Sequence, residues 1–519
     1  MHPGMIGQSM QTVGNQAMSR TSDADHIPVL IGVGEICDRP AADADGLDAI
    51  DLMIAALRTA ETDVGASILD RLDWLGVEDE ISFPMPAPQQ VLADRLGIAP
   101  PHLVKTFEAS GDGPLQLIND AANLIGRGEI RLAAAVGAEA LRTAARRAAA
   151  IVAAGGEPPK SSVAEVAAAN ATPLARKHHL LTPIDVYPLY ENATRAAWGQ
   201  TLEEGQQETA AIWSGFSQVA ADNPFAWMRK PVSPEQVAEV TADNRMISFP
   251  YTKLMVANAS VNMGAAVIVA SLAMARELGV PEDRLVYVGP GAAAHESDDF
   301  LLRDSYARSA SLETTVTAAL DRNALKTADI DHVELYSCFP CVPKMARRVL
   351  GWPADRPASV YGGLTFGGGP IGNCMMHAAA RMVHKLRDGG EHGLIVANGG
   401  YATHSHSLVL TRRPVPAGAF PQDYNVQAEA DARRGPAPEI IDGYEGEGVI
   451  ETWTIPFGRK GEPLHATIIA RTPAGARFLA HVPGDDRETL DFLMAADAQP
   501  VGSAGRCESR NEKLLWLRS

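Results

Sequence analysis

Along roughly the first 400 positions, short continuous apolar runs alternate with stretches that have helical spacing. Continuous runs are typical of buried strands, and apolar residues three or four apart are typical of one helix face. The first strand pattern, 27–34, is followed by a helix pattern over 47–62, and the succession reaches a strand at 131–137. It begins again at 284–290 and ends with a strand at 393–397. This alternation predicts two α/β units.

The two units look like copies of each other. Three short matches occur in the same order: Ala55-Ala-Leu57 with Ala318-Ala-Leu320, Asp70 with Asp331, and Gly128-Glu129 with Gly390-Glu391. The members of each match are about 260 residues apart, a period too long for a solenoid. The pattern predicts an internal duplication, with two similar α/β domains side by side. Ligands of such sheets usually bind on loops beyond the carboxyl ends of the strands.

Two further regions break this alternation. Residues 146–243 interrupt the first unit with Ala-rich helices, the basic group Arg176-Lys-His-His179 and three tryptophans, and read as a covering domain. Near the end, stretches from Ile450, Ala466 and Ala476 alternate at period two, which predicts a small β-barrel. The expected organisation is a tail at 1–25, a first half at 26–290 that includes the insertion, a second half at 291–415, a linker at 416–438 and a barrel at 439–519.

The composition is that of a water-soluble globular protein, with 46% hydrophobic and 21% charged residues in 519. A net charge of −18 argues against nucleic-acid binding, and an anionic ligand would need a local basic patch. The N-terminal segment lacks the apolar core of a secretory signal, and the best apolar run, Gly264–Ala275, is too short for a membrane span. Five scattered cysteines predict reduced thiols and a cytoplasmic location.

Four segments carry a resemblance to the thiolase superfamily. They are Asn258-Ala-Ser-Val-Asn-Met-Gly-Ala-Ala266, Val333-Glu-Leu-Tyr-Ser-Cys-Phe339, Gly368-Gly-Pro-Ile-Gly372 and Gly393-Leu-Ile-Val-Ala-Asn-Gly-Gly400. They resemble, in order, the Asn-Ala-Ser segment, the strand-end motif, the glycine loop and the last strand with its catalytic loop. With the added β unit, the chain resembles bacterial acetyl-CoA acetyltransferases, or thiolase-like proteins with an additional C-terminal domain.

This resemblance covers about residues 26–415. It implies a duplicated thiolase-like α/β fold of two βαβαβαββ halves in five layers, αβαβα, with a helical insertion and an OB-like C-terminal β-barrel. It implies coenzyme A or an acyl-CoA as substrate and a place in lipid metabolism, with no permanently bound cofactor and no metal. It also implies a homodimer through the core sheets, which the barrel would either block or reinforce. Neither nucleic acid nor membrane insertion is expected.

The positions of the thiolase catalytic groups carry other residues here. Glu108 stands where the family has its nucleophilic Cys, and Tyr336 replaces the His or Asn of the strand-end motif. Gly369 replaces the histidine that helps to bind the thioester oxygen, and Asn398 replaces the second Cys, the acid/base. Thiolysis through an acyl-cysteine at the usual place is therefore not available.

The remaining thiols and phenols leave alternatives open. Cys338 would accept an acyl group if a base lowered its pKa, or is a small buried apolar group. Cys338 and Cys341 form a CxxC, but zinc would need a second such pair. Tyr336 is either a half-buried aromatic or a proton donor and acceptor for an aldol oxygen, because the superfamily's aldolases also have Tyr at this position. The second catalytic Tyr of those aldolases has no obvious counterpart.

Five further side chains are candidates for the chemistry. His377, after the glycine loop, is either a base that reaches the pocket or structural. His404 and His406 lie two apart on a predicted strand and point the same way; one would replace the lost Cys, and a metal site would need further ligands. Asn398 is a neutral donor for a thioester oxygen. Glu108 is a base, a mimic of an acyl group, or a cap of the following helix.

A second group of residues is expected to bind CoA. Ser260 matches the serine that relatives place beside the pantetheine, and Lys253, Arg229 and Lys230 are expected to meet the phosphates. A surface turn before Pro231 explains the basic pair equally well. The backbone N–H groups of the glycine loop, at Gly368 and Gly369, are free to approach a ligand because these residues have no side chain.

The sequence thus predicts a thiolase-like acyl-CoA enzyme of the acyltransferase class. It would act on the carbon–carbon bond next to a CoA thioester without the usual nucleophilic Cys. A retro-aldolase acting on β-hydroxyacyl-CoA is the enzymatic alternative. A non-catalytic acyl-CoA-binding homologue is the alternative of a different class, because all four signature groups are replaced.

Overall fold

The computed structural model describes residues 23–41, 45–157, 171–510 and 513–518. Within them, ten strands form one continuous mixed sheet. The strand order is β3, β2, β4, β7, β1, β8, β12, β11, β10, while β9 pairs with β12. The two expected halves are joined through β8, which pairs with β1 on one side and with β12 on the other.

The elements of the two α/β units lie close to their predicted positions. The strands are β1 (Pro28–Cys37), β2 (Trp74–Val77), β3 (His102–Lys105), β4 (Leu132–Glu139), β7 (Met263–Ser271), β8 (Val286–Val288), β9 (Ala292–His295), β10 (His332–Leu335), β11 (His392–Gly399) and β12 (His404–Thr411). The helices are α1 (Ala49–Val64), α2 (Pro88–Leu96), α3 (Gly113–Gly126), α10 (Leu272–Glu277), α11 (Ala310–Arg322), α12 (Cys341–Leu350) and α13 (Cys374–Asp388).

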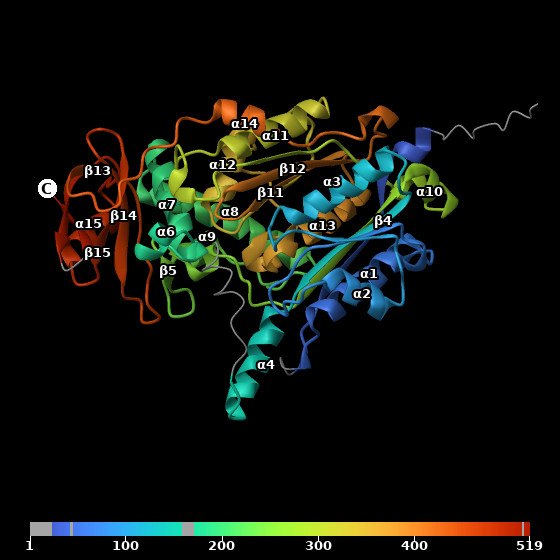
Figure 1. Cartoon of the computed structure of the whole chain (residues 1–519), viewed down its shortest axis with the longest axis horizontal. Helices are drawn as coiled ribbons and strands as arrows, with labels where there is room; N and C mark the ends of the chain where they lie inside the picture. Colours follow the sequence, from blue (N-terminus) through green and yellow to red (C-terminus); the bar gives the residue numbers. More distant parts are fainter. Residues whose placement is uncertain (1–22, 42–44, 158–170, 511–512, 519) are drawn as a thin grey trace, which may run out of the picture.

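The core is layered as the resemblance implied. Strands β4 and β7 are buried along their whole length because they are continuous runs of small and branched apolar residues. Helices α1 and α2 cover one side of the first half, and α11 and α12 cover the second half (Figure 1). Helices α3 and α13 pack between the halves and contact strands of both. The two parts of the continuous sheet therefore lie on either side of α3 and α13, and this gives the predicted αβαβα order of layers.

The insertion is mainly helical. It contains α4 (Leu141–Ala153), α6 (Pro173–Lys177), α7 (Pro183–Ala197), α8 (Leu202–Asp222) and α9 (Pro234–Ala238), followed by the hairpin β5 (Met246–Ser248) and β6 (Tyr251–Thr252). Helix α4 projects from the body, and α7 lies between the body and the C-terminal domain (Figure 1). Trp213 of α8 is fully buried, so it is a core residue. No helix in the described residues is long and apolar enough to cross a lipid bilayer.

The C-terminal residues form the predicted closed five-stranded barrel. Its elements are β13 (Gly446–Thr454), β14 (His465–Arg471), β15 (Arg477–Pro483), α15 (Arg487–Met494), β16 (Ala504–Arg510) and β17 (Lys513–Arg518). Trp453, Phe478 and Trp516 are buried in its own core. The expected linker contains a helix, α14 (Gln427–Arg433), that packs on α11.

A buried arginine ties the barrel to the body. Arg477 of β15 is fully buried and donates hydrogen bonds to the carbonyl oxygens of Leu301 and Arg303, the latter at 2.8 Å. It also forms an ion pair with Glu451 at 2.7 Å, and its guanidinium lies 4.8 Å from the centroid of the Tyr306 ring. These partners belong to both the barrel and the body, so the contact couples the stability of the two parts.

The substitution R477M is expected to lower the free energy of unfolding by about 3–5 kcal/mol, because it leaves the buried Leu301 and Arg303 carbonyl groups without their donor and removes one of the two arginines that bind Glu451. R471M is the matched control: Arg471 binds the same Glu451 carboxylate, but its side chain is 29% exposed, and its loss should cost about 1 kcal/mol or less. Urea unfolding followed by circular dichroism measures both. Equal losses would contradict the anchoring role of Arg477.

A histidine cluster at the contact between barrel and insertion is expected to make the stability of the protein fall in acid. The rings of His179, His465 and His481 lie with centroids between 5.0 and 5.8 Å apart. Burial lowers the pKa of His465 and that of His481 to about 4. Between about pH 6.5 and 4 the unfolded chain binds protons that the folded chain does not, so stability should fall as the pH drops through this window.

Above pH 6.5 these histidines should add no pH dependence, since they are neutral in both states. The double variant H465Q/H481Q is expected to flatten the decline between pH 6.5 and 4. Denaturant unfolding at a series of pH values measures this, and a decline as steep as in the unmodified protein would contradict the assignment.

Candidate active site

Three of the predicted residues meet in a buried cluster at the strand ends of the second half. Tyr336 and Cys338 follow β10, and Asn398 lies near the end of β11. Because β10 and β11 are parallel neighbours, their carboxyl ends lie side by side, and the Tyr336 backbone N–H donates to the Val396 carbonyl at 3.0 Å. The three residues are 7%, 9% and 8% exposed. The structure thus brings these three of the predicted site residues together.

Two contacts between a phenol and a thiol organise this cluster. The Tyr336 hydroxyl contacts the thiol of Cys374, the first residue of α13, and the Tyr187 hydroxyl contacts the thiol of Cys338. The Nδ2 atom of Asn398 donates to the Tyr187 hydroxyl at 3.0 Å. Tyr187 comes from α7 in the insertion, and sequence reasoning missed it. Nothing in its local sequence distinguishes it from a core aromatic.

Burial determines the protonation of this cluster. It raises the pKa of the Cys338 thiol to about 12, and it also raises the pKa of Cys374. It raises the pKa values of Tyr336 and Tyr187 well above their usual value of 10. All four groups therefore keep their protons near neutral pH, so the thiols are weak nucleophiles and the phenols are hydrogen-bond donors.

The segment 110–112, which leads into α3, forms one wall of the cluster. A Cβ atom at Gly111 would lie 2.5 Å from the Tyr336 hydroxyl, so only glycine fits there. The backbone N–H of Ser110 donates to Oε1 of Glu78 at 2.9 Å. Glu78 directly follows β2, and burial raises the pKa of its carboxyl well above the usual range. It was missed as a candidate, although an acidic residue after a buried strand was the available signal.

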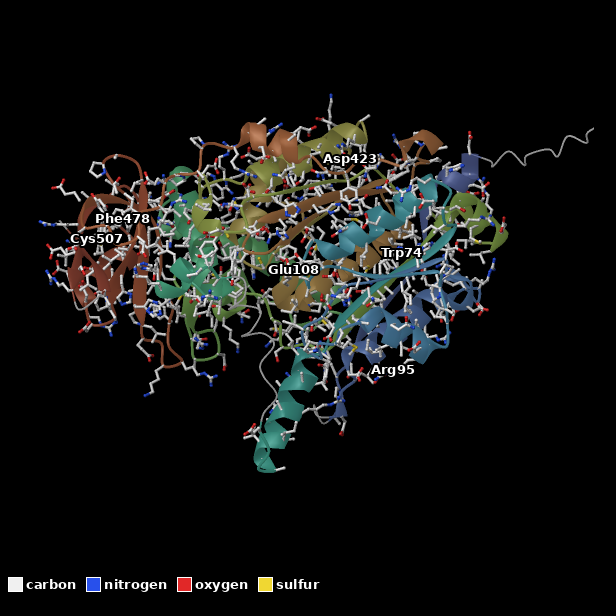
Figure 2. The ribbon with its side chains drawn as sticks, viewed as in Figure 1. Trp74, Arg95, Glu108, Asp423, Phe478 and Cys507 are labelled. Atoms are coloured by element: carbon white, nitrogen blue, oxygen red, sulfur yellow. The ribbon has the colours of Figure 1, made fainter. Side chains whose placement is uncertain are left out.

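Glu108 and His404 line an open cavity of about 620 Å³, and Tyr336 is not among the residues that line it. The side chain of Glu108 is exposed, near the middle of the molecule (Figure 2). Burial alone would lower the pKa of His404, but hydrogen bonds to Asp112 and Asp298 and the charge of Glu108 outweigh it and raise this pKa to about 9. Glu108 and His404 are thus separated from Tyr336, contrary to the expectation of a single site.

The other two histidines have structural partners. The Nδ1 atom of His377 is 3.0 Å from Glu35 Oε1, and its ring stacks on Tyr361. Of the two alternatives for His377, the structure therefore favours the structural one. The buried carboxylate of Glu35, from β1, holds its imidazole away from the cluster. His406 is buried, and its Nε2 atom lies 2.5 Å from Nδ2 of Asn119.

The segments expected to bind CoA meet at the surface beside the cluster. The backbone N–H of Trp227 donates to Gly367, that of Gly369 donates to Asn258, and that of Ala257 donates to Cys338. The glycine loop, the basic turn and the segment before Ser260 are therefore contiguous with the strand-end motif. The exposed members are Arg229, Lys230, Lys253 and Ser260, whereas Gly368 and Gly369 are buried.

Two arginines that sequence reasoning missed flank Trp227. Arg39 and Arg142 lie 4.7 and 5.8 Å from the centroid of its ring. Arg39 also donates to the Ala226 carbonyl at 2.8 Å, and the backbone of Arg142 donates to Val261, the neighbour of Ser260. In the sequence only their positive charge could have pointed to them, and charged residues are common on any protein surface. Together with Arg229 and Lys230 they form a local basic surface on an acidic protein.

Comparison with known proteins places these features in context. Residues 425–512 match the family described as the thiolase-like protein type 1 additional C-terminal domain. No curated protein matches the chain. Among solved structures, the monomeric SCP2-thiolase like protein type 1 from Mycobacterium smegmatis is 27% identical, with a TM-score of 0.80 over 95% of this chain and 100% of that one.

Two further structures share the fold at lower identity. The Ltp2-ChsH2(DUF35) aldolase is 16% identical, with a TM-score of 0.57 over 76% of this chain and 100% of that one. The human mitochondrial 3-ketoacyl-CoA thiolase in complex with CoA is 16% identical, with a TM-score of 0.56 over 75% of this chain and 98% of that one. The chain thus has the thiolase-like fold, and its residues 425–512 match the additional C-terminal domain of the type 1 thiolase-like proteins.

Proposed function

We propose that this chain binds an acyl-CoA thioester and makes or breaks the carbon–carbon bond next to the thioester carbonyl by proton transfer. No acyl-cysteine forms in this scheme. The observation that carries the proposal is the buried set of protonated phenols and thiols around Asn398. A phenol with a raised pKa donates a hydrogen bond to a developing oxyanion, whereas a protonated thiol is a poor nucleophile.

The basic surface around Trp227 supplies the binding part of the proposal. Arg39, Arg142, Arg229 and Lys230 offer positive charge for phosphates, and the Trp227 ring offers a flat apolar face. From there, the segment before Ser260 leads to the main chain of Cys338. A thiolase with this fold has been solved with CoA bound, which supports the substrate class.

The reacting end is assigned to the cluster. In a retro-aldol cleavage a base takes the hydroxyl proton, the carbon–carbon bond breaks, and the electron pair passes to the thioester oxygen as an enolate, which is then protonated at carbon. Tyr336 and Asn398 are the donors for that oxygen. Glu78 supports this part of the site: its Oε1 atom accepts from the Ser110 backbone N–H, and the next residue, Gly111, lies against the Tyr336 hydroxyl.

The alternatives rest on different observations. The acyltransferase reaction expected from the resemblance requires a thiolate, and burial of Cys338 and Cys374 opposes one. Binding without catalysis is favoured by the low exposure of the cluster, at most 9% for Tyr336, Cys338 and Asn398. The experiments below separate these candidates.

The double variant R229E/K230E is expected to weaken CoA binding by about 10-fold or more, since each exposed charge contact contributes up to ~1 kcal/mol. The matched control is R459E/K460E, which reverses an exposed Arg-Lys pair on the barrel. Isothermal titration calorimetry with CoA at low salt measures both. Equal affinity in the two variants would contradict the assignment of the basic surface.

The variant Y336F is expected to lower turnover of a β-hydroxyacyl-CoA by about 100-fold or more while the affinity for CoA stays the same, because only the donated proton is lost. C338S should lower turnover by less than about 10-fold, since no acyl-cysteine forms. Steady-state kinetics with a panel of acyl chains, together with intact-protein mass spectrometry, measures both effects.

An acyl adduct that maps to Cys338 would contradict proton-transfer chemistry and establish acyl transfer. CoA binding without turnover of any β-hydroxyacyl- or β-ketoacyl-CoA would leave the binding function and remove the catalytic one. Absence of any CoA affinity would overturn the whole proposal.

A further inference from the structure

A group of metal-ligating side chains lies in the open cavity, outside the buried cluster. His295 of β9 and His404 of β12 are direct register partners on neighbouring antiparallel strands. Directly opposed residues of such a pair project on the same face of the sheet. Their imidazole rings therefore meet, with centroids 4.4 Å apart.

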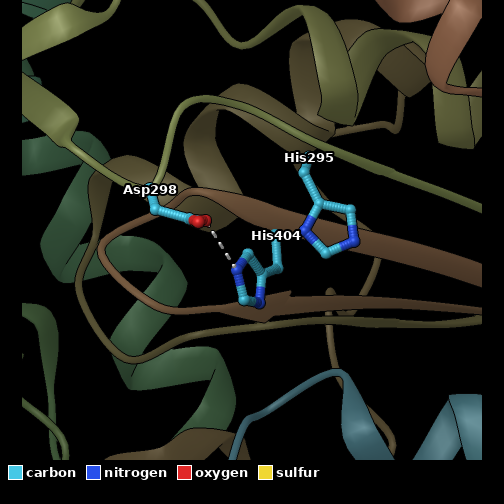
Figure 3. A group of neighbouring side chains, drawn as sticks. All are labelled: His295, Asp298 and His404. Carbon is cyan, nitrogen blue, oxygen red and sulfur yellow. Dashed lines mark hydrogen bonds and ion pairs between the residues drawn. The ribbon is translucent and has the colours of Figure 1, made fainter. Parts of the chain in front are cut away.

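A carboxylate completes the group. Asp298, on the loop after β9, turns its Oδ1 atom toward Nε2 of His404 at a distance of 3.4 Å (Figure 3). One ligand atom from each of His295, Asp298 and His404 lies within 4.8 Å of the others. Two ligands each ~2.1 Å from a tetrahedral zinc ion are ~3.4 Å apart, so the spacing of His404 and Asp298 already fits such an ion.

The surroundings hold these ligands in place. The Nδ1 atom of His404 faces Asp112 at 3.6 Å, the arrangement in which a carboxylate fixes the tautomer and orientation of a metal-binding imidazole. The backbone of His295 is clamped by Gln427, whose side chain accepts from its N–H at 2.8 Å and donates to its carbonyl at 2.9 Å. Glu108 lines the same cavity.

We propose that His295, His404 and Asp298 bind a divalent transition-metal ion of the Zn²⁺ type, with a remaining coordination position open to the cavity beside Glu108. Two imidazoles and one carboxylate form a ligand set that binds zinc and other first-row metals and leaves positions for water or a ligand. This site goes beyond the proposed CoA function, because Tyr336, Cys338 and Asn398 are not among the residues that line its cavity. It also departs from the sequence-based expectation of no metal. That expectation arose because the sequence did not show which residues would join His404 as ligands.

Metal binding by the full-length protein tests the site. After treatment with a chelator, the protein is titrated with Zn²⁺ and with Co²⁺, whose visible absorption reports imidazole and carboxylate ligands. One equivalent is expected to bind, and H404A and D298N are each expected to weaken binding by about 100-fold or more. D112N replaces the carboxylate that faces Nδ1 of His404 with a neutral amide and should weaken metal binding by about 10-fold. The variant D298N is expected to fold normally, because the Asp298 side chain is 90% exposed, so weaker metal binding in this variant would not reflect misfolding.

Two control variants exclude other histidines. H102A removes an exposed histidine of β3 and should leave binding unchanged. H465A disrupts the histidine cluster of the barrel and should also leave it unchanged. Binding that survives H404A and D298N, or that is lost in H465A, would overturn the proposal. Failure of the unmodified protein to bind either ion would overturn it as well, and would leave the CoA function untouched.

Discussion

The position of segment 110–112 is the constraint on which the site depends. It leads into α3, and its Ser110 backbone N–H donates to the buried side chain of Glu78. Gly111 lies against the Tyr336 hydroxyl, and a Cβ atom at Gly399 would lie within 2.2 Å of the side chains of Ser110 and Asp112. This close packing separates a buried cluster of phenols and thiols from an open cavity that holds carboxylates and imidazoles. Two chemically different environments therefore result from one loop.

The C-terminal barrel supports this arrangement through helix α7. Helix α7 supplies Tyr187 to the buried cluster, and its other side faces the barrel. Asn192 of α7 donates to the Trp453 carbonyl, and Thr452 donates to the Leu189 carbonyl of α7. Because these buried polar groups satisfy each other across the interface, the barrel fixes the helix that completes the cluster. The additional domain is thus part of the structural support of the candidate site.

Comparison of expectation and structure shows where motifs are informative. Tyr336, Cys338 and Asn398 lie at the ends of parallel neighbouring strands, so their motif order alone was sufficient to bring them together. His377 lies on a helix in the same half, but a carboxylate of β1 holds its ring. Glu108 occupies the expected loop, and its side chain is exposed in the open cavity. A motif places a backbone position, whereas distant partners decide where the side chain points.

The sequence by itself determined the elements, the duplication and the barrel, because the spacing of apolar residues reports which face of a strand or helix is buried. Only the tertiary structure decided that Tyr187 joins Asn398, that Arg39 and Arg142 flank Trp227, and that His295 meets His404. These contacts join residues far apart in the chain, and packing and strand register set them, not local periodicity.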